Sequence, residues 1–214
     1  MEALGATLSA EEQVRAARFQ RPLDRSRYIA GRGQLRRLLG GYTGLTPEQL
    51  RFISGPKGKP ELASECNPDS LQFNLAHSGG MALYAVAWRR RVGVDLERIR
   101  ADVEIETLAA RFFTPEEAES LRSLPASQRT GAFFTCWTRK EAYLKARGDG
   151  ITFGLERFAV SLLPDAPPAL LRAPFDPAEV DRWTLHALDV GSDYAAALAV
   201  EGKERPTVSF FPPE

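Results

Sequence analysis

The sequence predicts an α+β protein with two similar lobes, each a small, mostly antiparallel sheet packed with a long helix. One element order occurs twice: a long helix, a strand segment and a two-stranded hairpin follow one another in residues 24–88 and again in residues 127–200. A chain of 214 residues is long enough for two small cores. We therefore expect a pseudo-duplication, with an N-terminal lobe of residues 1–92, a C-terminal lobe of residues 93–214 and a ligand site in the cleft between them.

The composition excludes several functional classes. The formal net charge is zero, which argues against bulk electrostatic binding to nucleic acid or to a membrane. The two cysteines make neither a disulfide framework nor a zinc site, and no signal peptide or membrane-spanning apolar run is visible. We expect a cytoplasmic protein, and a monomer, because two lobes in one chain form the cleft without a second copy.

Helix start and stop signals mark five helices. Ser9 and Glu12 form a capping box, and Gly148 is the expected C-cap of the last and longest helix. The arginine-rich side of the second helix is either a solvated face or reaches an anion. The helices are expected from Ser9 to Pro22, from Asp24 to Gly40-Gly41, over residues 103–113, from Thr114 to Pro125, and over residues 127–147.

Alternation of apolar and polar residues marks the strands. Two pairs of them are expected to form hairpins, the first with His77 and Ser78 at its tip. The strands are expected at residues 50–53, 71–75, 82–88, 92–96, 152–153, 157–163, 183–188 and 195–200.

Two carboxylates lie on one predicted strand, in the stretch Val92-Gly93-Val94-Asp95-Leu96-Glu97. Side chains alternate along a strand, so Asp95 and Glu97 face the same side. Two residues rise roughly 6.6 Å, and the longer glutamate can close that gap toward one ion. Gly93 carries no side chain, which lets another backbone or a ligand approach the strand.

A third carboxylate, Glu141, lies on the long helix. Trp137, Glu141 and Lys145 are four residues apart and therefore share a helix face. A glutamate followed by a lysine at this spacing is usually a surface ion pair. The aromatic surroundings of Glu141 indicate instead a largely buried helix, in which charged groups need partners.

The residue types indicate a hard metal ion. Carboxylates without a histidine or cysteine cluster select Mg²⁺, or Mn²⁺, over zinc. Lys59, Lys140 and Lys145 would balance a polyanionic substrate. Together they point to phosphoryl-type chemistry on a pyrophosphate, without indicating which one.

At these residues the sequence resembles the 4'-phosphopantetheinyl transferases, most closely the two-lobed, surfactin-synthetase-activating class. The stretch "VGVDLE", followed some forty residues later by "WTRKEAYLK", is similar to the signature pair of that family. The resemblance covers most of the chain. It includes "GKP" at 58–60, "FNLAHSG" at 73–79 and "RFFTPEE" at 111–117.

The resemblance implies a reaction: the 4'-phosphopantetheine arm of coenzyme A moves to a serine of an apo acyl or peptidyl carrier protein, and adenosine 3',5'-bisphosphate is released. Asp95, Glu97 and Glu141 would hold Mg²⁺ at the coenzyme A pyrophosphate. Glu141, directly or through a water molecule, would take the serine proton. Lys145 would bind the pyrophosphate and stabilise developing charge, and Lys140 would support the site from the same helix.

The resemblance also implies contacts to the nucleotide part of coenzyme A. His77 would bind the 3'-phosphate, and Ser78 would compensate for Ala76, which stands where this turn commonly carries a serine. Arg15 falls at a basic position directed to the 3'-phosphate, and Tyr28 at a threonine position of better-known members. The Gly58-Lys59-Pro60 loop would line the adenine pocket.

The resemblance also implies that the carrier protein binds beside the metal, with Phe112, Phe113 and Thr114 as candidate contacts; the alternative, which the residues themselves favour, is that both phenylalanines are core residues. Two other functions remain open from the residues alone. A Mg²⁺-dependent nucleotide pyrophosphohydrolase would explain the carboxylates and lysines but not the paired motifs. A non-catalytic carrier-protein-binding protein would not need three carboxylates and Lys145.

Overall fold

The computed structural model describes residues 1–55, 57–150, 153–204 and 207–209. The chain forms two compact units, Met1–Gly55 with Pro60–Leu71, and Pro56–Lys59 with Gln72–Glu214. The mixed α and β fold with small antiparallel sheets is confirmed. The predicted lobe boundary at residues 92 and 93 stays a prediction. Among the described residues, no helix has both the length and the apolar character needed to span a membrane.

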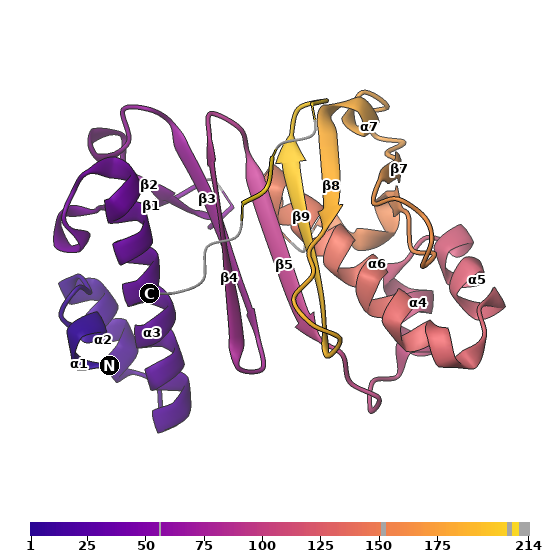
Figure 1. Cartoon of the computed structure of the whole chain (residues 1–214), viewed down its shortest axis with the longest axis horizontal. Coiled ribbons are helices and arrows are strands. Elements are labelled where there is room, and N and C mark those ends of the chain that lie inside the picture. Colours follow the sequence, from indigo (N-terminus) through magenta and orange to yellow (C-terminus); the bar gives the residue numbers. More distant parts are fainter. Residues whose placement is uncertain (56, 151–152, 205–206, 210–214) are drawn as a thin grey trace. The chain divides into compact units, whose positions relative to one another are not determined.

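The first unit is mainly helical (Figure 1). Its elements are α1 (Glu2–Gly5), α2 (Ala10–Ala17), α3 (Pro22–Thr43), β1 (Phe52–Ser54) and β2 (Pro60–Leu62), with 3₁₀ turns at Pro47–Gln49 and Ser64–Cys66. The predicted capping box of Ser9 and Glu12 is present at the start of α2. Gly40-Gly41 does not stop α3 as predicted: the helix continues to Thr43 and ends at Gly44, whose φ of 71° is left-handed.

The arginine-rich side of α3 reaches an internal anion. The Glu12 carboxylate is buried and accepts hydrogen bonds from Arg32 and Arg36. Arg36 is itself 2% exposed and donates further to the carbonyl groups of Pro47 and Leu50, at 2.6 and 3.0 Å. Part of the predicted basic face is therefore an internal ion-pair network that ties α2 and the turn after α3 to the helix.

The second unit contains the larger core (Figure 1). Its helices are α4 (Ile105–Phe112), α5 (Pro115–Ser123), α6 (Ala126–Arg147) and α7 (Glu179–Arg182), with a 3₁₀ turn at Leu155–Arg157. Its strands are β3 (Leu71–Ser78), β4 (Met81–Trp88), β5 (Val92–Arg98), β6 (Ala159–Val160), β7 (Leu170–Arg172), β8 (Trp183–Ala187) and β9 (Tyr194–Glu201). Strands β5, β9 and β8 form one antiparallel sheet in that order, and α6 packs across it.

The predicted repeat of elements is present in the order of the chain. Helices α3 and α6 each contain 22 residues. Each is followed by a short strand pair, β1 with β2 or β6 with β7, and then by a longer pair, β3 with β4 or β8 with β9. The predicted strand 157–163 is shorter than expected, because residues 155–157 form a 3₁₀ turn and only Ala159–Val160 pair with β7. Of the predicted strand 152–153, Thr152 lies outside the described residues and Phe153 belongs to no strand.

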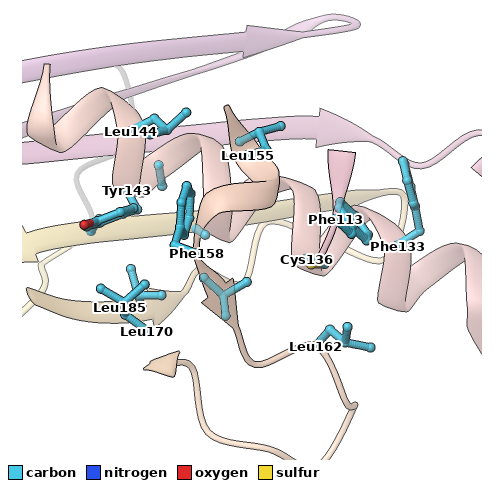
Figure 2. Close-up of a cluster of buried hydrophobic side chains, with 14 of the residues drawn as sticks. Phe113, Phe133, Cys136, Tyr143, Leu144, Leu155, Phe158, Leu162, Leu170 and Leu185 are labelled. Atoms are coloured by element: carbon cyan, nitrogen blue, oxygen red, sulfur yellow. The ribbon is translucent and has the colours of Figure 1, made fainter. Parts of the chain in front are cut away.

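An apolar cluster holds α6 in place (Figure 2). Phe113 stacks on Phe133 with ring centroids 5.2 Å apart, and Tyr143 lies edge-on to Phe158 at 4.8 Å. Leucine side chains of the following segments and of β7 and β8 complete the cluster. Because one side of α6 is fixed in this core, its other side is presented to β5 in a defined rotation.

Candidate active site

A pocket of about 360 Å³ lies where α6 faces β3 and β5 within the second unit. It brings together five of the predicted site residues: Asp95 and Glu97 from β5, Glu141 and Lys145 from α6, and His77 from β3. Its remaining lining residues are Leu75, Ala76, Leu96 and Trp137. Trp137 was predicted to share a helix face with Glu141 and Lys145, and all three line this pocket.

Gly93 allows the close contact between strand and helix on which the pocket depends. A Cβ atom at this position would overlap the carbonyl oxygen of Ala142 and the backbone nitrogen of Ala146, both in α6. The predicted approach of another backbone to Gly93 is thus the packing of α6. This packing places Asp95, which is two residues further along β5, opposite Lys145 of α6. The distance between Lys145 Nζ and Asp95 Oδ1 is 2.6 Å.

Burial perturbs two of the carboxylates. Burial raises the pKa of Glu141 to about 7, and the neighbouring Asp95 and Glu97 add to the shift while Lys145 opposes it. Burial also raises the pKa of Asp95, which is 5% exposed, although its ion pair with Lys145 acts in the opposite direction. Acidic groups with raised pKa values in a pocket mark a candidate for proton-transfer chemistry.

The third carboxylate, Glu97, is held by β3. Ser78 Oγ donates a hydrogen bond to Glu97 Oε2 at 2.9 Å and accepts one from the backbone N–H of Arg98 at 3.0 Å. Ser78 and His77 end strand β3, and the turn that follows consists of Gly79 and Gly80. The tip of the hairpin therefore lies one or two residues after the predicted positions of His77 and Ser78. His77 is exposed and lines the pocket.

The carboxylates suit a hard cation by their chemistry, although two of them are turned to other partners. Among the described residues, no group of three or more His, Cys, Asp or Glu side chains is arranged to hold a metal ion. Glu97 is turned to Ser78 and Asp95 to Lys145. Two buried carboxylate oxygens, Asp95 Oδ2 and Glu141 Oε1, nevertheless receive no hydrogen bond from any residue that the structure describes. Unsatisfied buried carboxylate oxygens fit Mg²⁺ or Mn²⁺, which bind oxygen ligands.

Lys140 does not reach the pocket, contrary to the expectation from the sequence. Its side chain is fully buried on the core side of α6, where Nζ lies 2.7 Å from Glu117 Oε2. The same nitrogen donates to the carbonyl groups of Leu155 and Phe158, at 2.9 and 2.5 Å. All three of its protons have acceptors inside the core, so Lys140 is not part of the candidate site.

Two of the three predicted carrier-protein contacts are buried. Phe113 packs in the core against Phe133, and Thr114, 1% exposed, caps α5 by accepting a hydrogen bond from the backbone of Glu117. Neither offers a surface to a partner, which corrects the expectation. Phe112 is half-buried and lies edge-on to Trp137, with ring centroids 5.6 Å apart. It is the one candidate of the three that adjoins a pocket residue.

The remaining predicted contacts lie outside this pocket. Arg15 and Tyr28 belong to the first unit, where the Arg15 guanidinium lies 5.5 Å from the centre of the Tyr28 ring. Pro60 begins β2 in the same unit. Lys59 belongs to the second unit and donates to the carbonyl oxygen of Val92 at 2.9 Å, at the start of β5. Roles for these residues in binding coenzyme A stay predictions.

Sequence reasoning missed Asn74 as a structural part of the site. Asn74 is buried, and its Oδ1 accepts a hydrogen bond from the Val94 N–H at 2.9 Å, which ties β3 to β5 beside Asp95. An asparagine at a buried strand position needs hydrogen-bond partners. That signal was available in the stretch 71–75, but it did not indicate which backbone group the side chain would bind.

Two family models match the chain. Residues 91–199 match the 4'-phosphopantetheinyl transferase superfamily, and residues 1–89 match the N-terminal part of 4'-phosphopantetheinyl transferases. A solved structure, the holo-[acyl-carrier-protein] synthase of Thermotoga maritima, is 20% identical with a TM-score of 0.40 and covers 53% of this chain and 63% of its own. A similarity at that level supports no conclusion about function.

Named relatives are similar over most of their length. The 4'-phosphopantetheinyl transferase HetI of Nostoc sp. (strain PCC 7120) is 46% identical over 202 residues, which cover 94% of this chain and 82% of HetI. The transferase psf-1 of Bacillus pumilus is 34% identical, covering 81% and 72%. The transferase Sfp of Bacillus subtilis (strain 168) is 29% identical, covering 74% and 68%.

The two signature stretches predicted from the sequence meet in one pocket, and both halves of the chain match the same family. The chain therefore belongs to the 4'-phosphopantetheinyl transferase superfamily, in its Sfp-type class, and is an enzyme of that family.

Proposed function

We propose that this enzyme transfers the 4'-phosphopantetheine arm of coenzyme A to a serine of an apo acyl or peptidyl carrier protein. The serine oxygen forms a bond to the phosphorus that carries the pantetheine arm. The bond from that phosphorus to the bridging pyrophosphate oxygen breaks, and the oxygen leaves with adenosine 3',5'-bisphosphate. The observation that carries the proposal is the pocket itself, which joins three carboxylates, a lysine and a histidine from β3, β5 and α6.

We propose that Asp95, Glu97 and Glu141 hold one Mg²⁺ ion, which Mn²⁺ can replace. When bound, the ion would neutralise charge on the coenzyme A pyrophosphate. The support is the all-oxygen donor set and the two buried carboxylate oxygens that lack a donor among the described residues. A divalent cation would compensate the burial of negative charge that now raises the pKa of Asp95 and Glu141.

Glu141 is the proposed general base, directly or through a water molecule. A carboxylate has two oxygen atoms, so one can bind the ion while the other accepts a proton, and Glu141 lines the proposed reaction pocket. Trp137, one turn earlier on α6, adds an apolar ring to the lining of the pocket, and an apolar lining reduces contact with water. The serine proton is thus received by a carboxylate in a partly dry environment.

Lys145 and His77 are the proposed contacts to phosphate. Lys145 is about one third exposed at its side chain, and its ammonium group already binds a carboxylate oxygen of Asp95. A phosphate oxygen of the pyrophosphate can take a further proton of the same ammonium group. His77, exposed at the end of β3, is proposed to bind the 3'-phosphate, with Lys59, Pro60, Arg15 and Tyr28 completing the nucleotide contacts.

The carrier protein is proposed to approach beside Phe112. This side chain is half-buried and packs on the pocket residue Trp137, so a partner that contacts it would bring its serine close to the pocket.

The test is an incubation of the enzyme with coenzyme A, Mg²⁺ and a panel of apo carrier proteins, read by mass spectrometry. We expect the mass of the 4'-phosphopantetheine arm on the acceptor serine, adenosine 3',5'-bisphosphate in equal amount, and neither product when the carrier or Mg²⁺ is left out. A pyrophosphohydrolase would release nucleotide without any carrier. Release at the same rate with and without every carrier would contradict the proposal.

A further inference from the structure

We infer that Ser78 is a positioning residue for Glu97 rather than a contact to coenzyme A. The inference rests on the proposed function, in which Glu97 is one of three carboxylates that hold a divalent ion. Three features of the second unit carry it: the hydrogen bonds of the Ser78 hydroxyl, the fixed place of strand β3 beside β5, and the tight turn that follows Ser78.

The hydroxyl group of Ser78 both donates and accepts a hydrogen bond within the protein. Its single proton is donated to Glu97 Oε2, at 2.9 Å, and one of its lone pairs accepts the Arg98 N–H, at 3.0 Å. A serine hydroxyl has one proton and two lone pairs. Ser78 therefore has no proton left for a phosphate oxygen unless it releases the carboxylate.

Strand β3 is fixed against β5 at two points by side chains. Asn74 and Ser78 are four residues apart on β3, and they accept the N–H groups of Val94 and Arg98, which are four residues apart on β5. Residues four apart on a strand point to the same side, so these two contacts match in spacing. Asp95 and Glu97, the carboxylates of β5, lie between them.

The turn after Ser78 adds a third constraint. Gly79 has a φ of 58°, and a Cβ atom there would lie 2.9 Å from the hydroxyl oxygen of Tyr194 and 3.3 Å from Cδ of Arg98. Tyr194 is the β9 partner of Arg98. The turn therefore packs closely against the end of β5 at Arg98, whose N–H group Ser78 also accepts. Because of this close packing, Ser78 has little freedom to move away from Glu97.

These contacts give Ser78 a definite effect on ion binding. A glutamate on a strand end loses side-chain entropy when it binds an ion, and a hydrogen bond from a rigid neighbour removes part of that freedom in advance. Groups that orient a metal ligand typically contribute about 10- to 100-fold to metal affinity. Among the described residues it is Ser78, and not the preceding His77, that is hydrogen-bonded to Glu97.

The test measures Mn²⁺ binding to the full-length protein without coenzyme A, from the electron paramagnetic resonance signal of free Mn²⁺. Ser78→Ala should bind Mn²⁺ about 10- to 100-fold more weakly than the wild type. Ser78→Thr keeps the hydroxyl group and should restore the affinity. Asn74→Ala is the matched control, because it removes a β3 contact to the β5 backbone without touching a carboxylate, and it should lower thermal stability more than Mn²⁺ affinity.

A double-mutant cycle separates an effect on Glu97 from a general loosening of the strand. In a Glu97→Gln background, Ser78→Ala should cause no further loss of Mn²⁺ affinity, because the group it orients is already absent. An equal loss in both backgrounds, an unchanged Ser78→Ala variant, or an equal effect of Asn74→Ala would each overturn the inference.

The effect of Ser78 on coenzyme A binding is measured separately. At saturating Mg²⁺, Ser78→Ala should leave the KM for coenzyme A unchanged, whereas His77→Ala should raise it; a raised KM in Ser78→Ala would assign Ser78 to coenzyme A and overturn the inference. If the wild type itself bound no Mn²⁺, the result would refute the proposed ion site of Asp95, Glu97 and Glu141, on which the inference about Ser78 rests. If the wild type binds Mn²⁺ and transfers the arm, only the role of Ser78 is at stake.

Discussion

Glu141 combines three properties that a surface glutamate lacks. It is partly buried, it faces two other carboxylates, and its Oε1 atom is without a hydrogen-bond donor among the described residues. Replacement by glutamine keeps the size and removes the negative charge. We expect Glu141→Gln to lower kcat by at least ~100-fold, the lower range for a general base, as measured by the mass increase of the carrier protein.

Glu119→Gln is the control for that variant. Glu119 lies exposed on α5, where it pairs with Arg122, and exposed ion pairs contribute little. Its transfer rate should equal that of the wild type. A Glu141→Gln enzyme that transferred the arm at the wild-type rate would remove Glu141 from the chemistry.

Two lysines of the same helix are predicted to behave in opposite ways. Lys140→Met leaves Glu117 buried without its cation, which should cost about 3–5 kcal/mol of unfolding free energy. Lys145→Met removes a charge from the pocket and should lower transfer about 100-fold, with a smaller change in stability. Urea unfolding and transfer assays on both variants measure the contrast. Equal stability losses would show that the core position of Lys140 is wrong.

Five of the residues predicted from the sequence line one pocket, but Lys140 does not, and the reason is helical geometry. Glu141 and Lys145 are four apart and share the pocket face, whereas Lys140 is four residues after Cys136 and shares the core face. Adjacency in the "RKEAYLK" motif favoured a shared role that the helix does not allow. Phe113 and Thr114 were misplaced for a related reason, since a motif does not indicate which of its residues face the core.

At the scale of elements, the contact of β5 with α6 depends on the absence of one side chain. Gly93→Ala should separate the strand from the helix, since the added atom meets backbone rather than a flexible side chain. We expect a loss of at least about 3 kcal/mol in unfolding free energy, the upper range for overpacking, together with loss of transfer. Thermal and urea unfolding measure the first effect.

Gly131→Ala is the matched control in α6. Nothing lies within 4 Å of a Cβ atom at Gly131, and alanine is favoured over glycine in a helix by about 0.5–1 kcal/mol. This variant should be slightly more stable than the wild type. If Gly93→Ala were as stable as Gly131→Ala, the close packing of β5 on α6 would be refuted.

The packing of α2 on α3 gives a prediction for pH. Burial would raise the pKa of Glu12, but the hydrogen bonds from Arg36 and Arg32 outweigh it and lower the pKa. A carboxylate with a lowered folded-state pKa contributes stability that is complete above its unfolded pKa, about 4.3, and is lost as the pH falls through the folded value. The unfolding free energy of the wild type should therefore exceed that of Glu12→Gln at pH 7 by more than at pH 3.

Urea titrations of the two proteins across this range test the prediction. The gap between them should narrow as the pH falls below about 4. If the difference in unfolding free energy stayed constant from pH 7 to pH 3, the contribution of Glu12 to stability would not depend on its charge. The capping box at Ser9 was predictable from the sequence, but the partners of Glu12, 20 and 24 residues further along, were not, because they depend on how α2 packs on α3.

At the scale of the whole molecule, the sequence predicted the repeat of a long helix and strand pairs because each element carries local signals. The capping residues, the alternation of the hairpins and the glycine after α6 are such signals. The pairing of β5 with β9 joins residues more than ninety positions apart, and nothing local specifies its register. The place of β3 in the same compact unit as α6 was likewise not predictable, since it depends on Asn74 and Ser78 meeting β5.

The most direct measurement of the proposed centre is an anomalous difference map from crystals of the enzyme grown with Mn²⁺ and coenzyme A. We predict one strong peak bonded to carboxylate oxygens of Asp95, Glu97 and Glu141, beside the pyrophosphate and Lys145. A peak elsewhere, or a coenzyme A complex in which Glu97 and Glu141 make no contact to the ion, would contradict the proposal that strand β5 and helix α6 together hold the metal for transfer.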